Sequence, residues 1–102
     1  MSEVGNHIVV HIIVFGRVQG VGYRAFVERE AVRRNLTGWV RNRRDGTVEA
    51  VFKGEAGAID DMIAACRRGP FAARVDAIDR REAVAEELEL REGGRFAVLP
   101  TI

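Results

Sequence analysis

Gly16-Arg17-Val18-Gln19-Gly20-Val21-Gly22-Tyr23-Arg24 is the stretch of this 102-residue chain in which an apolar run ends and a helical pattern begins. Residues 7–15 before it are mostly apolar, as in a strand, and residues 23–35 after it carry an apolar stripe at helical spacing. The three glycines between them allow positive φ angles and let a ligand approach the main chain closely. The stretch is therefore predicted to form a loop that joins a strand to a helix; residues 16–22 are called the glycine loop below.

The glycine loop is predicted to bind an anion. The first N–H groups of the following helix lack partners within the helix and point back toward the loop. These amides and the positive end of the helix dipole favour compact negative charge, of which a phosphoryl group is the expected form. Arg24 falls in the first helical turn, where the dipole opposes a cation by up to about 1 kcal/mol. A residue that breaks a local rule in this way indicates a function.

A β-hairpin is predicted next in the chain. Residues 39–42 and 47–53 read as strands, and the turn Arg43-Arg44-Asp45-Gly46 between them ends in the Asp-Gly pair that hairpins favour. In the second of these strands Val48, Ala50 and Phe52 share one parity, whereas Thr47, Glu49 and Lys53 share the other. This alternation predicts a sheet with one covered face and one wetter face. In the strand over residues 7–15 the even positions are the candidates for the buried face.

A second helix is predicted after residues 54–57, because Ile59, Met62, Ile63 and Cys66 follow helical spacing. The run Arg67-Arg68-Gly69-Pro70 is typical of a helix end. Residues 74–82 are interpreted as a fourth strand and residues 95–99 as a short closing strand ended by Pro100. Residues 83–92 fit either a loop or a short helix.

This order of elements predicts an α+β, ferredoxin-like (split β-α-β) sandwich: βαββαβ with a short extra C-terminal strand, and two helices on one face of a mostly antiparallel sheet. In such a sheet the first strand lies between the third and the fourth, so the second is one strand further away. Asn42, at the end of the second strand, is expected to face the glycine loop. An alternative is that Asn42 caps the hairpin turn.

Length and composition predict one soluble domain over residues 7–102, with residues 1–6 a frayed terminus. No apolar run is long enough to span a membrane and no signal peptide is visible, so a cytoplasmic protein without a membrane partner is expected. The single cysteine, Cys66, excludes an intrachain disulfide and is expected to be a buried core thiol rather than a nucleophile.

The charges are nearly balanced, with a net charge of +1, and Lys53 is the single lysine. The arginine excess reflects either a codon bias or a positive field near the glycine loop, formed by Arg17, Arg24, Arg41, Arg43 and Arg44. This balance argues against a nucleic-acid partner. His7 and His11 could be metal ligands on one strand face, but no acidic or thiol partner is evident nearby, so neither a metal nor a cofactor is expected.

Two stretches of the chain resemble a known family. The glycine loop with Tyr23-Arg24, followed by Gly38-Trp39-Val40-Arg41-Asn42, then Gly46-Thr47-Val48 and Gly54, is similar to both signature stretches of the acylphosphatases. The resemblance covers about Val10 to Ala77 and more loosely the rest. Tyr23 departs from the family, which usually has Phe there, and adds a hydroxyl beside the loop.

The resemblance implies hydrolysis of a carboxyl-phosphate anhydride, a small acyl phosphate, to carboxylate and inorganic phosphate without a metal or a covalent intermediate. In that family the arginine matching Arg24 binds the phosphoryl oxygens together with loop amides, here those of Val18, Gln19, Gly20, Val21 and Gly22. The asparagine matching Asn42 orients the attacking water. A monomer is expected.

Two other classes of protein share this predicted fold. One is a non-catalytic anion-binding or regulatory module that keeps the loop but does not turn over substrate. The other is an RNA-binding domain, which stacks bases on paired aromatic residues in its central strands. The strand over residues 47–53 offers only Phe52, on the parity predicted to face the core, so the RNA-binding class is disfavoured.

Overall fold

The computed structural model describes residues 7–90 and 94–102, so the predicted frayed terminus, residues 1–6, lies outside it. Its strands and helices occur in the predicted order, with one additional short helix. They are β1 (His7–Arg17), α1 (Tyr23–Arg33), β2 (Thr37–Asn42), β3 (Val48–Glu55), α2 (Ala56–Arg68), β4 (Arg74–Glu82), α3 (Ala85–Leu88) and β5 (Ala97–Val98).

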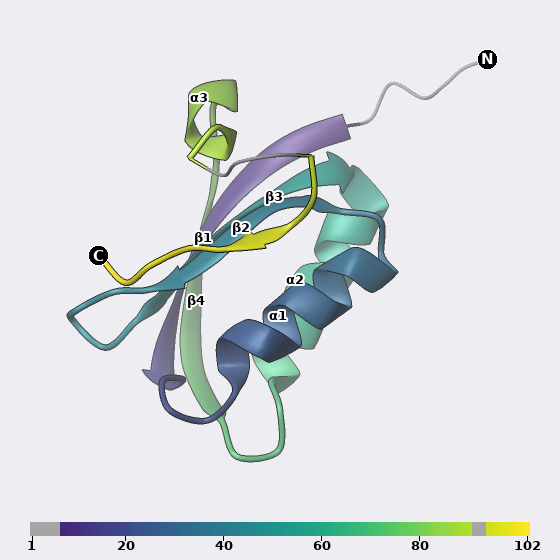
Figure 1. Ribbon diagram of the computed structural model, residues 1–102. Helices are drawn as coiled ribbons and strands as arrows, with labels where there is room; N and C mark the ends of the chain where they lie inside the picture. Colours follow the sequence, from purple (N-terminus) through teal and green to yellow (C-terminus); the bar gives the residue numbers. More distant parts are fainter. Residues whose placement is uncertain (1–6, 91–93) are drawn as a thin grey trace.

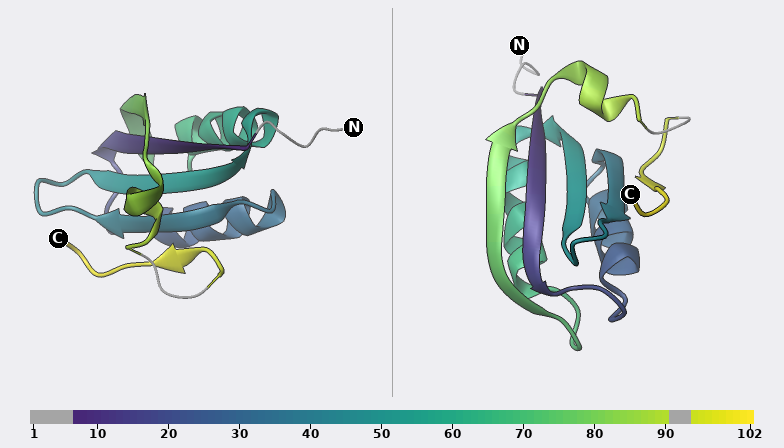
Figure 2. Two further views of the ribbon diagram at one scale, coloured as in Figure 1. Left: turned by 90° about the horizontal axis from the view of Figure 1, so that it is seen from above. Right: turned by 90° about the vertical axis from the view of Figure 1, so that its left-hand side faces the viewer.

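The strands form one five-stranded sheet in the order β4-β1-β3-β2-β5. All neighbours are antiparallel except β5, which runs parallel to β2. The two long helices, α1 and α2, pack side by side on one face of this sheet (Figures 1 and 2). The predicted ferredoxin-like arrangement is therefore confirmed, including the place of β1 between β3 and β4.

The main core lies between the sheet and the two long helices. The even residues of β1 and β3 supply the sheet side of this core, as predicted, and α2 supplies much of the opposite side. These residues include Val10, Ile12, Val14, Val48, Ala50, Phe52, Ile59, Met62, Ile63 and Cys66. Burial raises the pKa of the Cys66 thiol to about 12, which fits the predicted structural role and leaves almost no thiolate at neutral pH.

The other face of the sheet is less open to water than predicted. Trp39, Val51 and Leu88 form a second, smaller cluster there. Leu88 belongs to α3, and the indole N–H of Trp39 donates to the carbonyl of Glu87 at 2.7 Å. Residues 83–90, from the segment that the sequence left open between loop and helix, thus fold back over the middle of the sheet and cover what alternation predicted to be a wetter face; residues 91 and 92 of that segment lie outside the described residues.

The boundaries of the predicted elements differ from the observed ones by at most two residues, and those of β4 agree at both ends. Helix α1 ends at Arg33 because Asn35 adopts a left-handed φ of 58°, a conformation that a right-handed helix cannot include. Strand β1 continues past Phe15, where a bulge shifts its register with β4. Strand β5 is shorter than residues 95–99.

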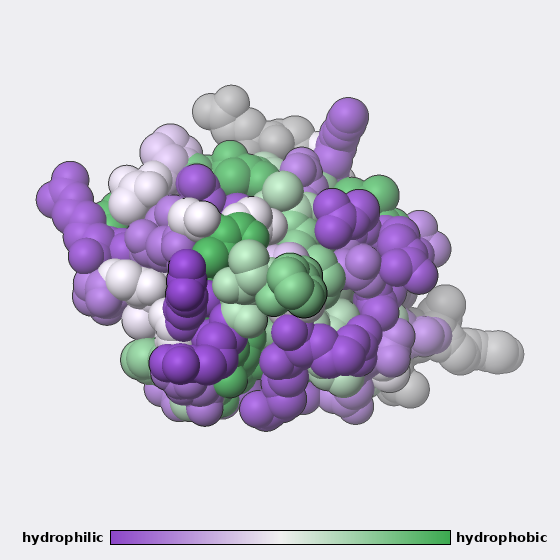
Figure 3. Space-filling view, turned by 90° about the horizontal axis from the view of Figure 1, so that it is seen from below, coloured by the Kyte–Doolittle hydropathy of each residue, from purple (hydrophilic) through white to green (hydrophobic). Residues whose placement is uncertain are grey.

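Figure 3 views the molecule from below, the end at which Figure 1 places the glycine loop and the loop between α2 and β4. Hydrophobic residues gather in the middle of this surface and hydrophilic residues surround them. Phe71, in the loop after α2, is fully exposed, and Phe15, directly before the glycine loop, is 37% exposed. Apolar surface therefore flanks the glycine loop.

Candidate active site

A pocket of about 320 Å³ lies where the glycine loop, the start of α1 and the end of β2 meet. Its walls include Val18, Gly20, Gly22, Arg24 and Asn42. The structure thus brings together the two side chains that the sequence singled out, although they are far apart in the chain. Such a volume is at the small end for ligand pockets and suits a small substrate.

The glycine loop leaves main-chain donors available at this pocket. Gly22 is the N-cap residue of α1, with φ 80°, and no side chain caps the helix. Its carbonyl accepts the first helical hydrogen bond, from the N–H of Phe26 at 3.1 Å. The first turn of α1 also contains no acidic residue. An uncapped helix start with positive-φ glycine is a suitable anion site.

Arg24 adds a cation at the start of this helix. Its side chain is half-buried on the pocket wall. Among the described residues no carboxylate lies within 4 Å of its guanidinium group. An arginine without an ion-pair partner beside open amides can bind two oxygens of one phosphoryl group.

Asn42 presents an unpaired acceptor. Its carboxamide Oδ1 is buried, and among the described residues it is the one buried side-chain N or O atom without a hydrogen-bond partner. A buried acceptor in this state costs about 1–3 kcal/mol, so a donor that enters the pocket is stabilised there. The Asn42 main chain is fixed, since its carbonyl accepts from the N–H of Ile102 at 3.1 Å.

The alternative role for Asn42, capping the hairpin turn, is wrong. Asp45 holds that turn: its Oδ1 accepts from the N–H of Thr47 at 3.0 Å and from the Thr47 hydroxyl at 2.6 Å. These bonds lower the pKa of the Asp45 carboxyl, the Thr47 hydroxyl having the largest effect. The Asn42 side chain is therefore left to the pocket.

Gln19 connects the glycine loop to the hairpin. Its side-chain amide donates to the carbonyl of Arg43 at 2.7 Å and to the carbonyl of Thr47 at 2.8 Å. Neither Gln19 nor Val21 is among the residues that line the pocket, whereas the other three predicted loop residues are. The sequence considered only the main chain of Gln19. The one signal available was an amide side chain in an otherwise apolar and glycine-rich loop.

The structure brings only part of the predicted arginine cluster to the pocket. Arg24 lines the pocket, but Arg41, Arg43 and Arg44 line a separate hollow with Asp45 and Glu49. Side chains alternate along β2, so Arg41 points to the opposite face from Asn42. There Arg41 donates to Glu49 at 2.8 Å and lies 4.7 Å above the Trp39 ring.

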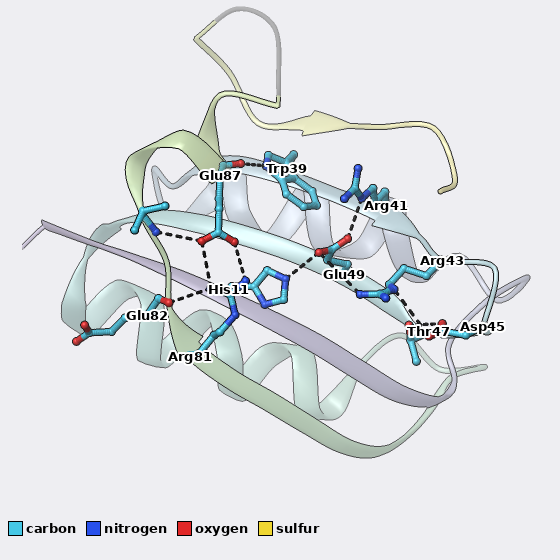
Figure 4. A network of polar contacts seen from close by, with 11 residues as sticks. His11, Trp39, Arg41, Arg43, Asp45, Thr47, Glu49, Arg81, Glu82 and Glu87 are labelled. Atoms are coloured by element: carbon cyan, nitrogen blue, oxygen red, sulfur yellow. Dashed lines mark hydrogen bonds and ion pairs between the residues drawn. The ribbon is translucent and has the colours of Figure 1, made fainter.

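His11 also has a partner that the sequence did not reveal. Its Nε2 lies 2.8 Å from Oε2 of the buried Glu49 on the neighbouring strand, in the polar network on the sheet face opposite the two long helices (Figure 4). Burial alone would raise the pKa of Glu49, but hydrogen bonds from His11 and Arg41 outweigh it and lower that pKa. Within residues 7–90 and 94–102 no three His, Cys, Asp or Glu side chains converge as metal ligands.

Tyr23 connects the two long helices. Its hydroxyl, expected beside the loop, donates instead to the carbonyl of Cys66 in α2 at 2.8 Å. The side chain is buried, and this burial raises the pKa of the phenol well above its usual range. The hydroxyl therefore stabilises the packing of α1 on α2 and is not a proton donor for the pocket.

The fold and the site define a class: a ferredoxin-like α+β domain with a pocket between a glycine loop and the end of an inner strand. Comparison with known proteins is more specific. The model of the family described as Acylphosphatase matches residues 10–96. The chain belongs to the acylphosphatase family, and it is an enzyme that hydrolyses acyl phosphates and releases inorganic phosphate.

Individual relatives agree with this. The acylphosphatase of Rhodopseudomonas palustris (strain BisB18) is 56% identical over 96 residues, which cover 93% of this chain and 97% of that protein. The crystal structure of the Bacillus subtilis acylphosphatase matches with a TM-score of 0.79 and 40% identity, over 90% of this chain and 98% of that one. Full-length HypF in its phosphate- and nucleotide-bound form matches with a TM-score of 0.83 and 29% identity, over 99% of this chain and 13% of HypF.

Proposed function

We propose that hydrolysis proceeds by in-line attack of a water molecule that Asn42 orients, on a phosphoryl group held by Arg24 and by the backbone amides of residues 18–22. The reaction then needs neither a metal ion nor a covalent intermediate. The water oxygen forms a bond to phosphorus as the bond from phosphorus to the acyl oxygen breaks. The carboxylate leaves with the electron pair of that bond, and the water proton passes to a phosphoryl oxygen.

The observation that carries this proposal is that Arg24 lines the same pocket as Asn42, whose buried Oδ1 has no hydrogen-bond partner among the described residues. An acceptor without a protein donor can take a hydrogen bond from water and so fix the direction of the water lone pair. Phosphoryl transfer asks mainly for such positioning and for stabilisation of the equatorial oxygens. A carboxylate is a good leaving group and needs little acid assistance.

Glu28 is the carboxylate on the pocket wall that would be the candidate for a general base, so its substitution tests whether the reaction needs one. It lies on the pocket wall one helical turn after Arg24, and the sequence did not identify it. We expect Glu28 to have no proton-transfer role, because the substrate's phosphoryl oxygens can accept the water proton. Glu28→Gln is therefore expected to keep kcat within a few-fold of the parent enzyme.

The experiment is hydrolysis of benzoyl phosphate by the purified protein with a chelator present and a phosphate monoester as a control substrate. Loss of a donor aimed at the transition state typically costs about 10²- to 10³-fold in rate, and Arg24→Ala is expected to fall that far while staying folded. Asn42→Ala loses the group that positions the water, and a positioning error of about 1 Å can cost about 100-fold, so a similar loss is expected there. Near-normal turnover by either variant would contradict its assigned role. A collapse of activity in Glu28→Gln, or dependence on added metal, would replace this mechanism with base-assisted or metal-assisted attack.

We further propose that the protein acts as a monomeric single domain over residues 7–102 in the cytoplasm, without a nucleic-acid or membrane partner. The near balance of charge supports the first of these exclusions. No helix in the described part of the chain is long and apolar enough to cross a membrane. Sedimentation at micromolar concentration tests the monomer, and a dimer would refute it.

A further inference from the structure

A groove runs along α1 away from the active-site pocket. Between α1 and the segment that leads into β5 lies a second, larger cavity of about 770 Å³. It shares Ala25 and Glu28 with the active-site pocket, so the two cavities adjoin. The remaining walls, called the α1 groove below, are Arg29, Val32, Arg33, Arg95 and Phe96.

The α1 groove combines apolar walls with positive charge. Val32 is 56% exposed, and Phe96 is buried and stacks on Phe52 of the core, so the groove floor is apolar and rigid. Arg29 and Arg95 have no carboxylate within 4 Å among the described residues, whereas Arg33 lies 3.1 Å from Glu30. Within the described part of the chain, the groove therefore offers two arginines that have no carboxylate partner.

The position of the α1 groove matches the exit direction of the leaving group. In an in-line displacement the attacking and leaving oxygens lie on opposite sides of phosphorus. Asn42 belongs to β2 and does not line the groove, which begins on α1 at Ala25 and Glu28. If Asn42 holds the water, the acyl group lies on the side of phosphorus away from the Asn42 side chain, and we infer that it enters the groove where the two cavities meet at Ala25 and Glu28.

Resting on the mechanism above, we propose that the α1 groove is the acyl-binding subsite and that Arg29 and Arg95 select acyl phosphates whose acyl chain ends in an anion. The apolar floor contacts the short carbon chain, and the arginines pair with the terminal carboxylate or other anionic group. Glu28, at the junction of the two cavities, disfavours a charge close to the reacting carbonyl, so the anion is best placed at the far end of the chain.

The test compares acyl phosphates of equal length that differ only in the terminal group. The pairs are succinyl with butyryl phosphate and glutaryl with pentanoyl phosphate, measured as kcat/KM at low ionic strength. Partly solvated charge pairs contribute about 0.2–1 kcal/mol each, so two arginines predict a preference of about two- to thirtyfold for at least one diacid. High salt should reduce this preference.

The variant Arg29→Gln/Arg95→Gln should abolish the preference, because kcat/KM for the diacid substrate falls to that for the butyryl or pentanoyl substrate of equal length. The matched control is Arg67→Gln/Arg68→Gln, which removes two exposed charges at the end of α2, outside the groove. If the parent enzyme shows no preference for the diacid substrates, or if the control variant loses the preference equally, the groove does not select anionic acyl groups. Arg29 and Arg95 would then have no role in substrate selection. The mechanism itself is tested separately: if Asn42→Ala abolishes the hydrolysis of butyryl phosphate, the mechanism holds although the groove proposal has failed.

Discussion

Gln19→Ala separates phosphate binding from water positioning. The substitution keeps the main-chain N–H of residue 19 in the glycine loop but removes the amide that donates to the carbonyls of Arg43 and Thr47. The hairpin that follows Asn42 then loses its connection to the loop. We expect the binding of inorganic phosphate to change little and turnover to fall.

The magnitude follows from two hydrogen bonds. A typical internal hydrogen bond contributes about 0.5–1.5 kcal/mol to stability, and both bonds of Gln19 are partly buried. Their loss predicts a decrease of about 1–3 kcal/mol in the free energy of unfolding. A displacement of a positioning group by about 1 Å can lower a rate by up to about 100-fold, so kcat is expected to fall about 10- to 100-fold.

The assay combines urea denaturation with benzoyl phosphate kinetics and competitive inhibition by phosphate. Arg17→Ala serves as the control, because Arg17 is exposed at the end of β1 and should change stability by no more than about 0.5 kcal/mol. If Gln19→Ala keeps the parent kcat although its stability drops, the connection to the hairpin does not position Asn42. A large loss of phosphate affinity would mean that the side chain shapes the anion site itself.

Three further predictions concern stability and reactivity. The hydrogen bond from Arg81 lowers the pKa of Glu87 to about 2, so the stabilisation by the ionised Glu87 is complete above the ordinary pKa of 4.5 and is lost as the pH falls toward 2. In urea denaturation, the free energy of unfolding should therefore decrease less between pH 6 and pH 3 in Glu87→Gln than in the parent protein. An equal decrease in both proteins would contradict this. Gly22→Ala should cost about 1–2 kcal/mol because φ is 80° and an added Cβ meets nothing within 4 Å; a loss much above this range in the same denaturation assay would mean that the side chain clashes. Cys66 should resist iodoacetamide at pH 8 in the folded protein and react once it is unfolded, so rapid labelling of the native protein would contradict its burial.

The sequence predicted the features that depend on short-range pattern. Alternation along β1 and β3 and the helical spacing from Ile59 to Cys66 give the main core directly, because burial of one face fixes the parity of a strand or the stripe of a helix. The glycine loop and the start of α1 were equally local. These elements also place Arg24, since it follows the loop by two residues.

What the sequence did not predict depends on contacts between distant segments. Glu49 in β3 pairs with His11 in the neighbouring strand β1. This contact depends on the register between the two strands, which the sequence does not show. Trp39 is buried because residues 83–90 fold back over the sheet. The sequence of this segment has no clear helix or strand periodicity, so its position was not predicted. Arg41 and Asn42 are neighbours in β2 and therefore point to opposite faces of the sheet. The prediction that Arg41 lies near the glycine loop did not take this alternation into account.

The pairing of Asn42 with Ile102 has a consequence for synthesis and for engineering. Main-chain hydrogen bonds join residues 40–44 to residues 99–102, so the end of β2 gains these bonds only after residues 99–102 have been synthesised. A substitution or insertion that displaces residues 99–102 is therefore expected to disturb the end of β2, which carries Asn42.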